Sequence, residues 1–78
     1  MRQWYEHYGR ILPLARERAR QPNATKLDQR VYHHVLDRRA AFHPAVPPKL
    51  RRKLLKRQTT PKAQLLEALA HCLLVKAK

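Results

Sequence analysis

A short, strongly basic segment at residues 46–58 limits what this chain can fold into. It reads Val-Pro-Pro-Lys-Leu-Arg-Arg-Lys-Leu-Leu-Lys-Arg-Gln, and its paired prolines are typical of the start of a helix. At about 100° per residue, Leu50 and Leu54 share one side of that helix with Leu55 on their flank. Four basic residues share an arc on the far side: Lys49, Arg52, Lys53 and Lys56. We therefore expect Leu50 and Leu54 to dock against a core while the charged side faces a partner.

The charge of the whole chain indicates that this partner is a polyanion. The 78 residues include 18 lysines and arginines against 5 aspartates and glutamates, which gives a formal net charge of +13. Chains of this length bury only about 60% of their unfolded surface, so self-repulsion opposes a small core. A phosphate backbone would relieve the repulsion and release counterions. The expected partner is RNA, with DNA as the alternative and with protein neighbours in a ribonucleoprotein assembly as a further option.

The predicted nucleic-acid contacts are basic side chains of this segment and of the flanking regions. They are Lys49, Arg51, Arg52, Lys53, Lys56 and Arg57 in the segment, Lys62 after it, and Arg16, Arg20 and Arg30 before it. These residues are spread over several short elements, and no element presents a row of side chains suited to reading base edges. The pattern therefore favours contact with the phosphate backbone, and RNA over duplex DNA.

The rest of the chain predicts short helices joined by proline-containing turns. Helices are expected at about residues 2–20, 26–41, 49–58 and 61–75, with a kink or break at Pro13. Asn23 or Thr25 can cap the second helix, and Thr60 followed by Pro61 is a common helix opening. With one glycine and no strand-like alternation, the sequence predicts an all-α fold, a single small domain of four or five helices over residues 1–78.

The predicted core takes one apolar stripe from each helix. Its members are Trp4, Tyr8, Leu12, Val31, Val35, Leu50, Leu54, Leu66, Leu69 and Leu73. Tyr5 can belong either to this core or to a surface that stacks on bases. Cys72 lies in an apolar helical pattern, which predicts a buried thiol, and a lone cysteine suits a reducing compartment such as the cytoplasm.

The polar residues indicate a binding protein, not an enzyme. None of the five histidines forms an i, i+4 pair suited to zinc, so no metal and no cofactor are expected. The chain has no serine, and it has no carboxylate cluster that would hold Mg²⁺. A metal-independent ribonuclease using His33, His34 or His43 is the enzymatic alternative, but nothing places an acid and a base across one site. No apolar run approaches the roughly 18 residues of a membrane span, so no membrane partner is expected.

Two other binding functions stay open. The basic helix, the Thr59-Thr60-Pro61 turn and the last helix resemble a helix-turn-helix, as in a DNA-binding regulator. The first helix of the pair carries the charge, however, and the second is mostly apolar. A basic protein-interaction adaptor that meets an acidic or nucleic-acid-like surface, for which a phage origin is one option, is the other alternative.

A family resemblance points in the same direction as the charge. The run Leu-Asp-Gln-Arg-Val-Tyr-His-His-Val-Leu-Asp-Arg at residues 27–38, then Leu-Arg-Arg-Lys-Leu at 50–54 and Thr-Thr-Pro-Lys at 59–62, resembles the core of the ProQ/FinO family of RNA chaperones. The resemblance implies a helical fold that binds structured RNA, at a hairpin stem next to a 3′ single strand. It also implies RNA contacts by Arg51 and Lys62. Arg30 and Ala63 stand where that family usually has a glycine and a tyrosine.

Overall fold

The chain forms four helices, and the computed structural model describes residues 2–57 and 59–76. In order, these are α1 (Arg2–Arg20), α2 (Lys26–Ala41), α3 (Pro48–Lys56) and α4 (Pro61–Lys76), and the described residues contain no strand. The predicted all-α fold is therefore confirmed. The predicted bounds of the second helix match α2, whereas α3 ends two residues before Gln58, which lies outside the described residues.

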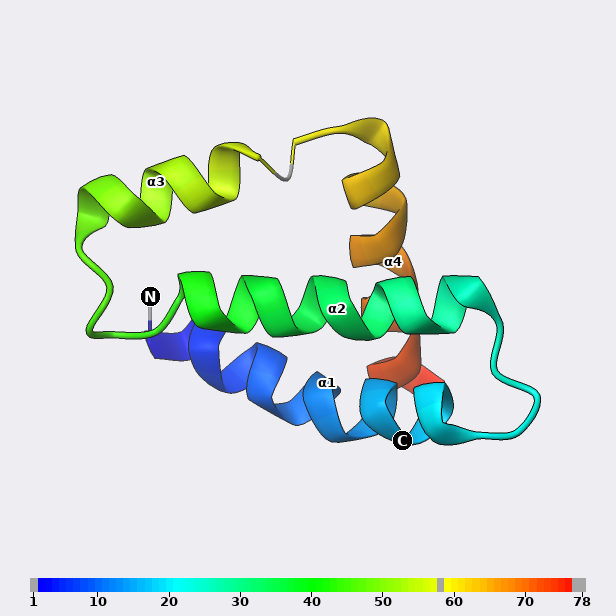
Figure 1. Ribbon diagram of the computed structural model, residues 1–78. Coiled ribbons are helices and arrows are strands. Elements are labelled where there is room, and N and C mark those ends of the chain that lie inside the picture. The colour runs from blue at the N-terminus through cyan, green and yellow to red at the C-terminus, as the bar shows by residue number, and fades with distance from the viewer. Residues whose placement is uncertain (1, 58, 77–78) are drawn as a thin grey trace.

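The helices pack around a pair formed by α1 and α2. These two run antiparallel along each other, and α4 crosses behind α2 and contacts both of them (Figure 1). α3 lies along the side of α2 that is opposite α1 (Figure 1). Among the described helices, α3 contacts only α2. The basic helix is thus the most loosely attached element of the fold.

Local sequence rules account for the helix starts. The Thr25 hydroxyl accepts from the Asp28 backbone N–H at 3.2 Å, and the Asp28 carboxylate accepts from the Thr25 N–H at 2.9 Å, which completes a capping box. Pro48 occupies the first turn of α3, and the Thr60 hydroxyl accepts from the Ala63 N–H at 3.2 Å. Of the kink or break expected at Pro13, the break is wrong, because α1 continues through this residue, and the kink stays a prediction.

The core lies between α1, α2 and α4. Its buried apolar members are Tyr8, Ile11, Leu12, Ala15, Val31, Val35, Phe42 and Ala70, with Leu66, Leu69 and Leu73 partly buried against them. Two core predictions are wrong, since Trp4 is 48% exposed and Leu50 is 46% exposed. The predicted burial of Cys72 is also wrong, because its thiol is exposed on α4. No helix in the described parts of the chain is long and apolar enough to cross a membrane.

The side of α3 that docks on α2 is rotated from the predicted one. Arg51 is 7% exposed and Leu55 packs against the core, whereas Leu50 points to the surface and Leu54 is only partly covered. Because Arg51 and Leu55 are four residues apart, they lie on one face of the helix. The predicted Leu50/Leu54 docking face is therefore replaced by an Arg51/Leu55 face.

Candidate nucleic-acid interface

The outward side of α3 carries a compact set of positive charges. We call this set the α3 basic surface, and it consists of Lys49, Arg52, Lys53, Lys56 and Arg57, all of which are exposed. The sequence of α3 contains no acidic residue, and no carboxylate in the described residues pairs with any of the five. Their charges are therefore available to an external anion.

Arg51, which the sequence places among the nucleic-acid contacts, lies on the inner side of α3 instead. Its Nε donates to the Ala41 carbonyl at 3.1 Å, and one terminal nitrogen donates to the carbonyls of His43 and Val46 at 3.2 and 3.0 Å. Ala41 is the last residue of α2, whose carbonyl has no partner within that helix. Arg51 therefore ties α3 to the turn before it, and we leave it out of the interface.

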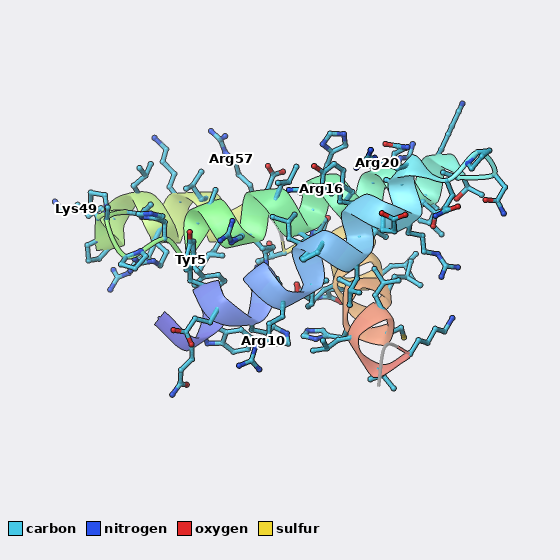
Figure 2. The ribbon with its side chains drawn as sticks, turned by 90° about the horizontal axis from the view of Figure 1, so that it is seen from below. Tyr5, Arg10, Arg16, Arg20, Lys49 and Arg57 are labelled. Carbon is cyan, nitrogen blue, oxygen red and sulfur yellow. The ribbon has the colours of Figure 1, made fainter. Side chains whose placement is uncertain are left out.

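The remaining predicted contacts fall into two groups. Arg30 of α2 and Lys62 of α4 are exposed on the rim of one open hollow of about 330 Å³ between these helices. Arg16 and Arg20 are exposed near the end of α1, and Figure 2 shows them on the same side of the molecule as Arg57, with Arg10 on the other side. The structure thus brings Arg30 and Lys62 together but leaves the α1 pair separate from them.

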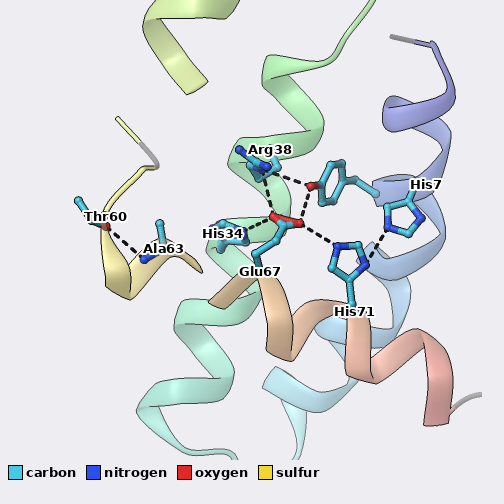
Figure 3. A network of polar contacts seen from close by, with 8 residues as sticks. His7, His34, Arg38, Thr60, Ala63, Glu67 and His71 are labelled. Carbon is cyan, nitrogen blue, oxygen red and sulfur yellow. Dashed lines mark hydrogen bonds and ion pairs between the residues drawn. The ribbon is translucent and has the colours of Figure 1, made fainter. Parts of the chain in front are cut away.

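A second polar cluster, which the sequence did not predict, is centred on the Glu67 carboxylate between α1, α2 and α4 (Figure 3). Glu67 accepts a hydrogen bond from the Tyr8 hydroxyl, and its Oε2 lies 3.0 Å from His34 Nε2 and 3.2 Å from Arg38 Nε. Its Oε1 lies 3.3 Å from Nε2 of His71, one turn further along α4. One carboxylate therefore links three helices.

The environment of Glu67 strongly favours its charged form. Burial would raise the pKa of this carboxyl, but hydrogen bonds from His34 and Tyr8 and the charge of Arg38 outweigh it and lower the pKa to about 2. Burial and the bond to Glu67 raise the pKa of Tyr8 to about 12, so its hydroxyl stays a donor. The cluster is thus a carboxylate surrounded by donors, an arrangement suited to joining helices.

The cluster extends to the surface through a pair of imidazoles. His7 Nε2 lies 3.1 Å from His71 Nδ1, so the chain of contacts runs from Glu67 through His71 to α1. Burial and the neighbouring His71 lower the pKa of His7. Within the described residues, no group of three histidine, cysteine or acidic side chains could hold a metal ion.

The histidines considered for ribonuclease chemistry are placed in different surroundings. His34 is buried against Glu67, and His33 is exposed beside it on α2. His43 lies in the turn before α3, where its ring packs edge-on against Tyr5 at a centroid distance of 5.2 Å. His33 and His34 both line the open hollow that also holds Arg30 and Lys62, whereas His43 is not among the residues that line it.

Stability should depend on pH through Glu67. The folded carboxyl has a pKa of about 2 against an ordinary 4.5, so its contribution is complete above pH 4.5 and is lost as the pH falls toward 2. Protonation of Glu67 should therefore lower the free energy of unfolding as the pH falls below 4.5. Urea denaturation of the wild type and of Glu67→Gln at pH 7, 4 and 3 measures this, and equal pH dependence in the two proteins would contradict it.

The sequence carried no clear signal of the Glu67 cluster, because its leucines at 65, 66, 69 and 73 lie on another side of α4 from Glu67. Glu67 lies four residues after Ala63 and three before Ala70, and both alanines are buried on the inner side of α4. An acidic residue on the buried side of a helix requires partners. Which histidine or arginine supplies them depends on how α4 crosses α2.

Comparisons with known proteins assign no relatives. No family model matches this chain, and no curated protein and no solved structure matches it. Fold and surface therefore define the class: a small all-helical domain that presents a strongly basic helix. The resemblance to ProQ/FinO RNA chaperones stays a prediction from sequence.

Proposed function

We propose that this protein binds RNA through the phosphate backbone, with the α3 basic surface as the main contact. The observation that carries the proposal is the exposure of all five of its basic side chains on a helix without acidic residues. A polyanion that covers this surface would reduce the repulsion within a chain of net charge +13. Lys62 and Arg30, on the rim of the neighbouring hollow, would extend the contact.

RNA is favoured over sequence-specific DNA binding by the way α3 and α4 are arranged. In a helix-turn-helix, the second helix is presented to the major groove. Here α4 contributes Ala63 and Ala70 to the buried interior, and α3 and α4 make no contact with each other in the described residues. The pair therefore does not form the helix-turn-helix unit that the sequence pattern suggested, and backbone recognition is the function that the surface supports.

We place this activity in the cytoplasm, either on free RNA or within a ribonucleoprotein particle. The lone thiol of Cys72 has no internal partner, as is typical of proteins in reducing compartments. Large apolar side chains such as Leu65 and Val75 are more than half exposed and could be covered by neighbouring subunits of such a particle.

The experiment that tests the proposal is a salt titration of RNA binding. The α3 variant replaces Lys49, Arg52, Lys53 and Lys56 with glutamine, which has a similar helix propensity and leaves Arg51 and Leu55 in place. Each lost phosphate contact should lower the slope of log affinity against log salt by roughly 0.7 to 0.9. We therefore expect a total decrease of about 3 on a structured RNA, measured by fluorescence anisotropy.

A matched control separates surface position from net charge. The control variant replaces Arg10, Arg18, Lys26 and Lys76, which are exposed and lie on other helices, with glutamine. Both variants remove four positive charges, from +13 to +9, so general attraction falls equally. Equal slopes for the two variants would remove α3 from the interface. Tight, sequence-specific binding to duplex DNA would instead favour the regulator, and binding of an acidic protein without any RNA binding would favour the adaptor.

A further inference from the structure

Arg39 of α2 is not among the predicted nucleic-acid contacts. Its side chain lies against α1, where its Nε has no hydrogen-bond acceptor among the described residues. The carbon at the centre of its guanidinium group lies 4.5 Å from the centre of the Tyr5 ring. Its Nε is buried and has no hydrogen-bond partner. A charged group with a desolvated, unpaired N–H costs stability unless something else compensates.

Two other described arginines, Arg38 and Arg51, are also partly or fully buried, and both have hydrogen-bond acceptors. Arg38 bonds to Glu67 and to the Tyr8 hydroxyl, and Arg51 donates to three backbone carbonyls. Among the arginine side chains that the structure describes, Arg39 is the one that is partly buried and still lacks an acceptor. Its two terminal nitrogens carry four N–H donors, and these have no hydrogen bond or ion pair with the described residues, so they are free to bind an anion.

The position of Arg39 depends on the single glycine of the chain. A Cβ atom at Gly9 would lie 3.4 Å from the Arg39 Nε, so the absence of a side chain there lets the guanidinium approach α1 closely. Tyr5, Gly9, Arg16 and Arg20 fall within about 60° of one another around α1. Figure 2 shows the labelled members, Tyr5, Arg16 and Arg20, on the side of α1 away from Arg10. Arg39 therefore joins a basic stripe along this helix.

We propose that Arg39 binds a phosphate group of the RNA and that this stripe is a second contact surface besides α3. The inference rests on the proposed RNA binding and extends it to the α1–α2 face. Stacking on Tyr5 holds the planar fork in place, so less side-chain entropy is lost when two parallel N–H groups bind a phosphate. Arg16 and Arg20 would bind further phosphates along the same strand.

Anion binding by Arg39 can be tested without RNA. The probe is inorganic phosphate, titrated into the full-length ¹⁵N-labelled protein while the arginine Nε–Hε signals are followed by NMR. The Arg39 signal is assigned by its loss in Arg39→Gln. We expect a saturable shift of the Arg39 signal and a smaller one for exposed Arg10, because stacking preorganises only the former. A shift of equal size for both arginines would overturn the site.

The RNA contact is tested by paired variants of equal charge. Arg39→Gln should weaken RNA binding about tenfold, as for loss of a charge-assisted hydrogen bond, and lower the salt slope by about 0.7 to 0.9. Arg10→Gln removes the same charge from the other side of α1 and should change affinity less than twofold. Arg39→Lys should keep the salt slope but lose affinity, because lysine lacks the planar fork.

The outcomes separate this inference from the proposed function. If wild type binds RNA, and Arg39→Gln and Arg10→Gln bind equally well, the Arg39 contact is refuted while the α3 interface stands. If wild type binds no RNA, the proposed function fails and the RNA assignment of Arg39 fails with it, whereas the phosphate titration still decides whether Arg39 is an anion site. Circular dichroism of each variant checks that the helices are retained.

Discussion

Replacing Glu67 with glutamine is expected to destabilise the fold by about 3 kcal/mol, because it removes a carboxylate that joins three helices. In the wild type, Arg38 Nε and the buried His34 Nε2 lie 3.2 and 3.0 Å from the Glu67 carboxylate. In the variant, both groups would face a neutral amide instead of a negative charge. For a chain of this length, such a loss corresponds to a decrease in Tm of roughly 12–24 °C. Thermal unfolding followed by circular dichroism at pH 7 measures it.

The matched control is Glu17→Gln, which removes the same charge at the surface of α1. Glu17 is exposed and accepts a single hydrogen bond from Gln21 at 3.2 Å. Exposed pairs of this kind contribute little, so the change should stay within about 0.5 kcal/mol. If both variants unfolded at the same temperature, the Glu67 cluster would have no special part in stability.

Arg51→Met is expected to detach α3 from the rest of the molecule. The substitution keeps an unbranched apolar side chain but removes the donors to the carbonyls of Ala41, His43 and Val46. Loss of hydrogen bonds from a charged donor should cost about 2–4 kcal/mol. Because α3 contacts only α2 among the described helices, the cost should appear as local opening of α3. Amide hydrogen exchange should therefore accelerate in residues 48–56 and much less in α1, α2 and α4.

The neighbouring Arg52→Met provides the comparison. Arg52 has the same charge and lies in the same helix, but its side chain is exposed. Its replacement should leave exchange in α3 close to the wild-type rate. Equal acceleration in the two variants would show that the docking of α3 depends on helix charge and not on the three hydrogen bonds of Arg51.

Local sequence rules were sufficient to predict the helices. The apolar period predicted α1, α2 and α4, and Thr25, Pro48 and Thr60 predicted where helices begin. These rules act over three or four residues, within the range of one helical turn or cap. The net charge of +13, and the anionic partner that it suggests, likewise follow from composition.

The sequence did not show that Arg51 is buried, or that Arg38 is paired and Arg39 is not. Arg51 and Arg52 are adjacent and chemically identical, as are Arg38 and Arg39, and the apolar residues around Arg51 predicted a different docking side for α3. Arg51 is buried because the end of α2 and the turn at residues 42–47 together bring three carbonyls to it, and Arg38 is paired because α4 crosses α2 at Glu67.

Sequence by itself therefore determined that the protein is a set of capped helices with a large excess of positive charge. The tertiary structure decided which of those charges are used inside the molecule and which remain for a partner. The physical reason is that burying an arginine requires acceptors, and here the acceptors come from other elements of the chain. Arg51 and Arg38 find them in the fold, whereas the α3 basic surface and Arg39 do not.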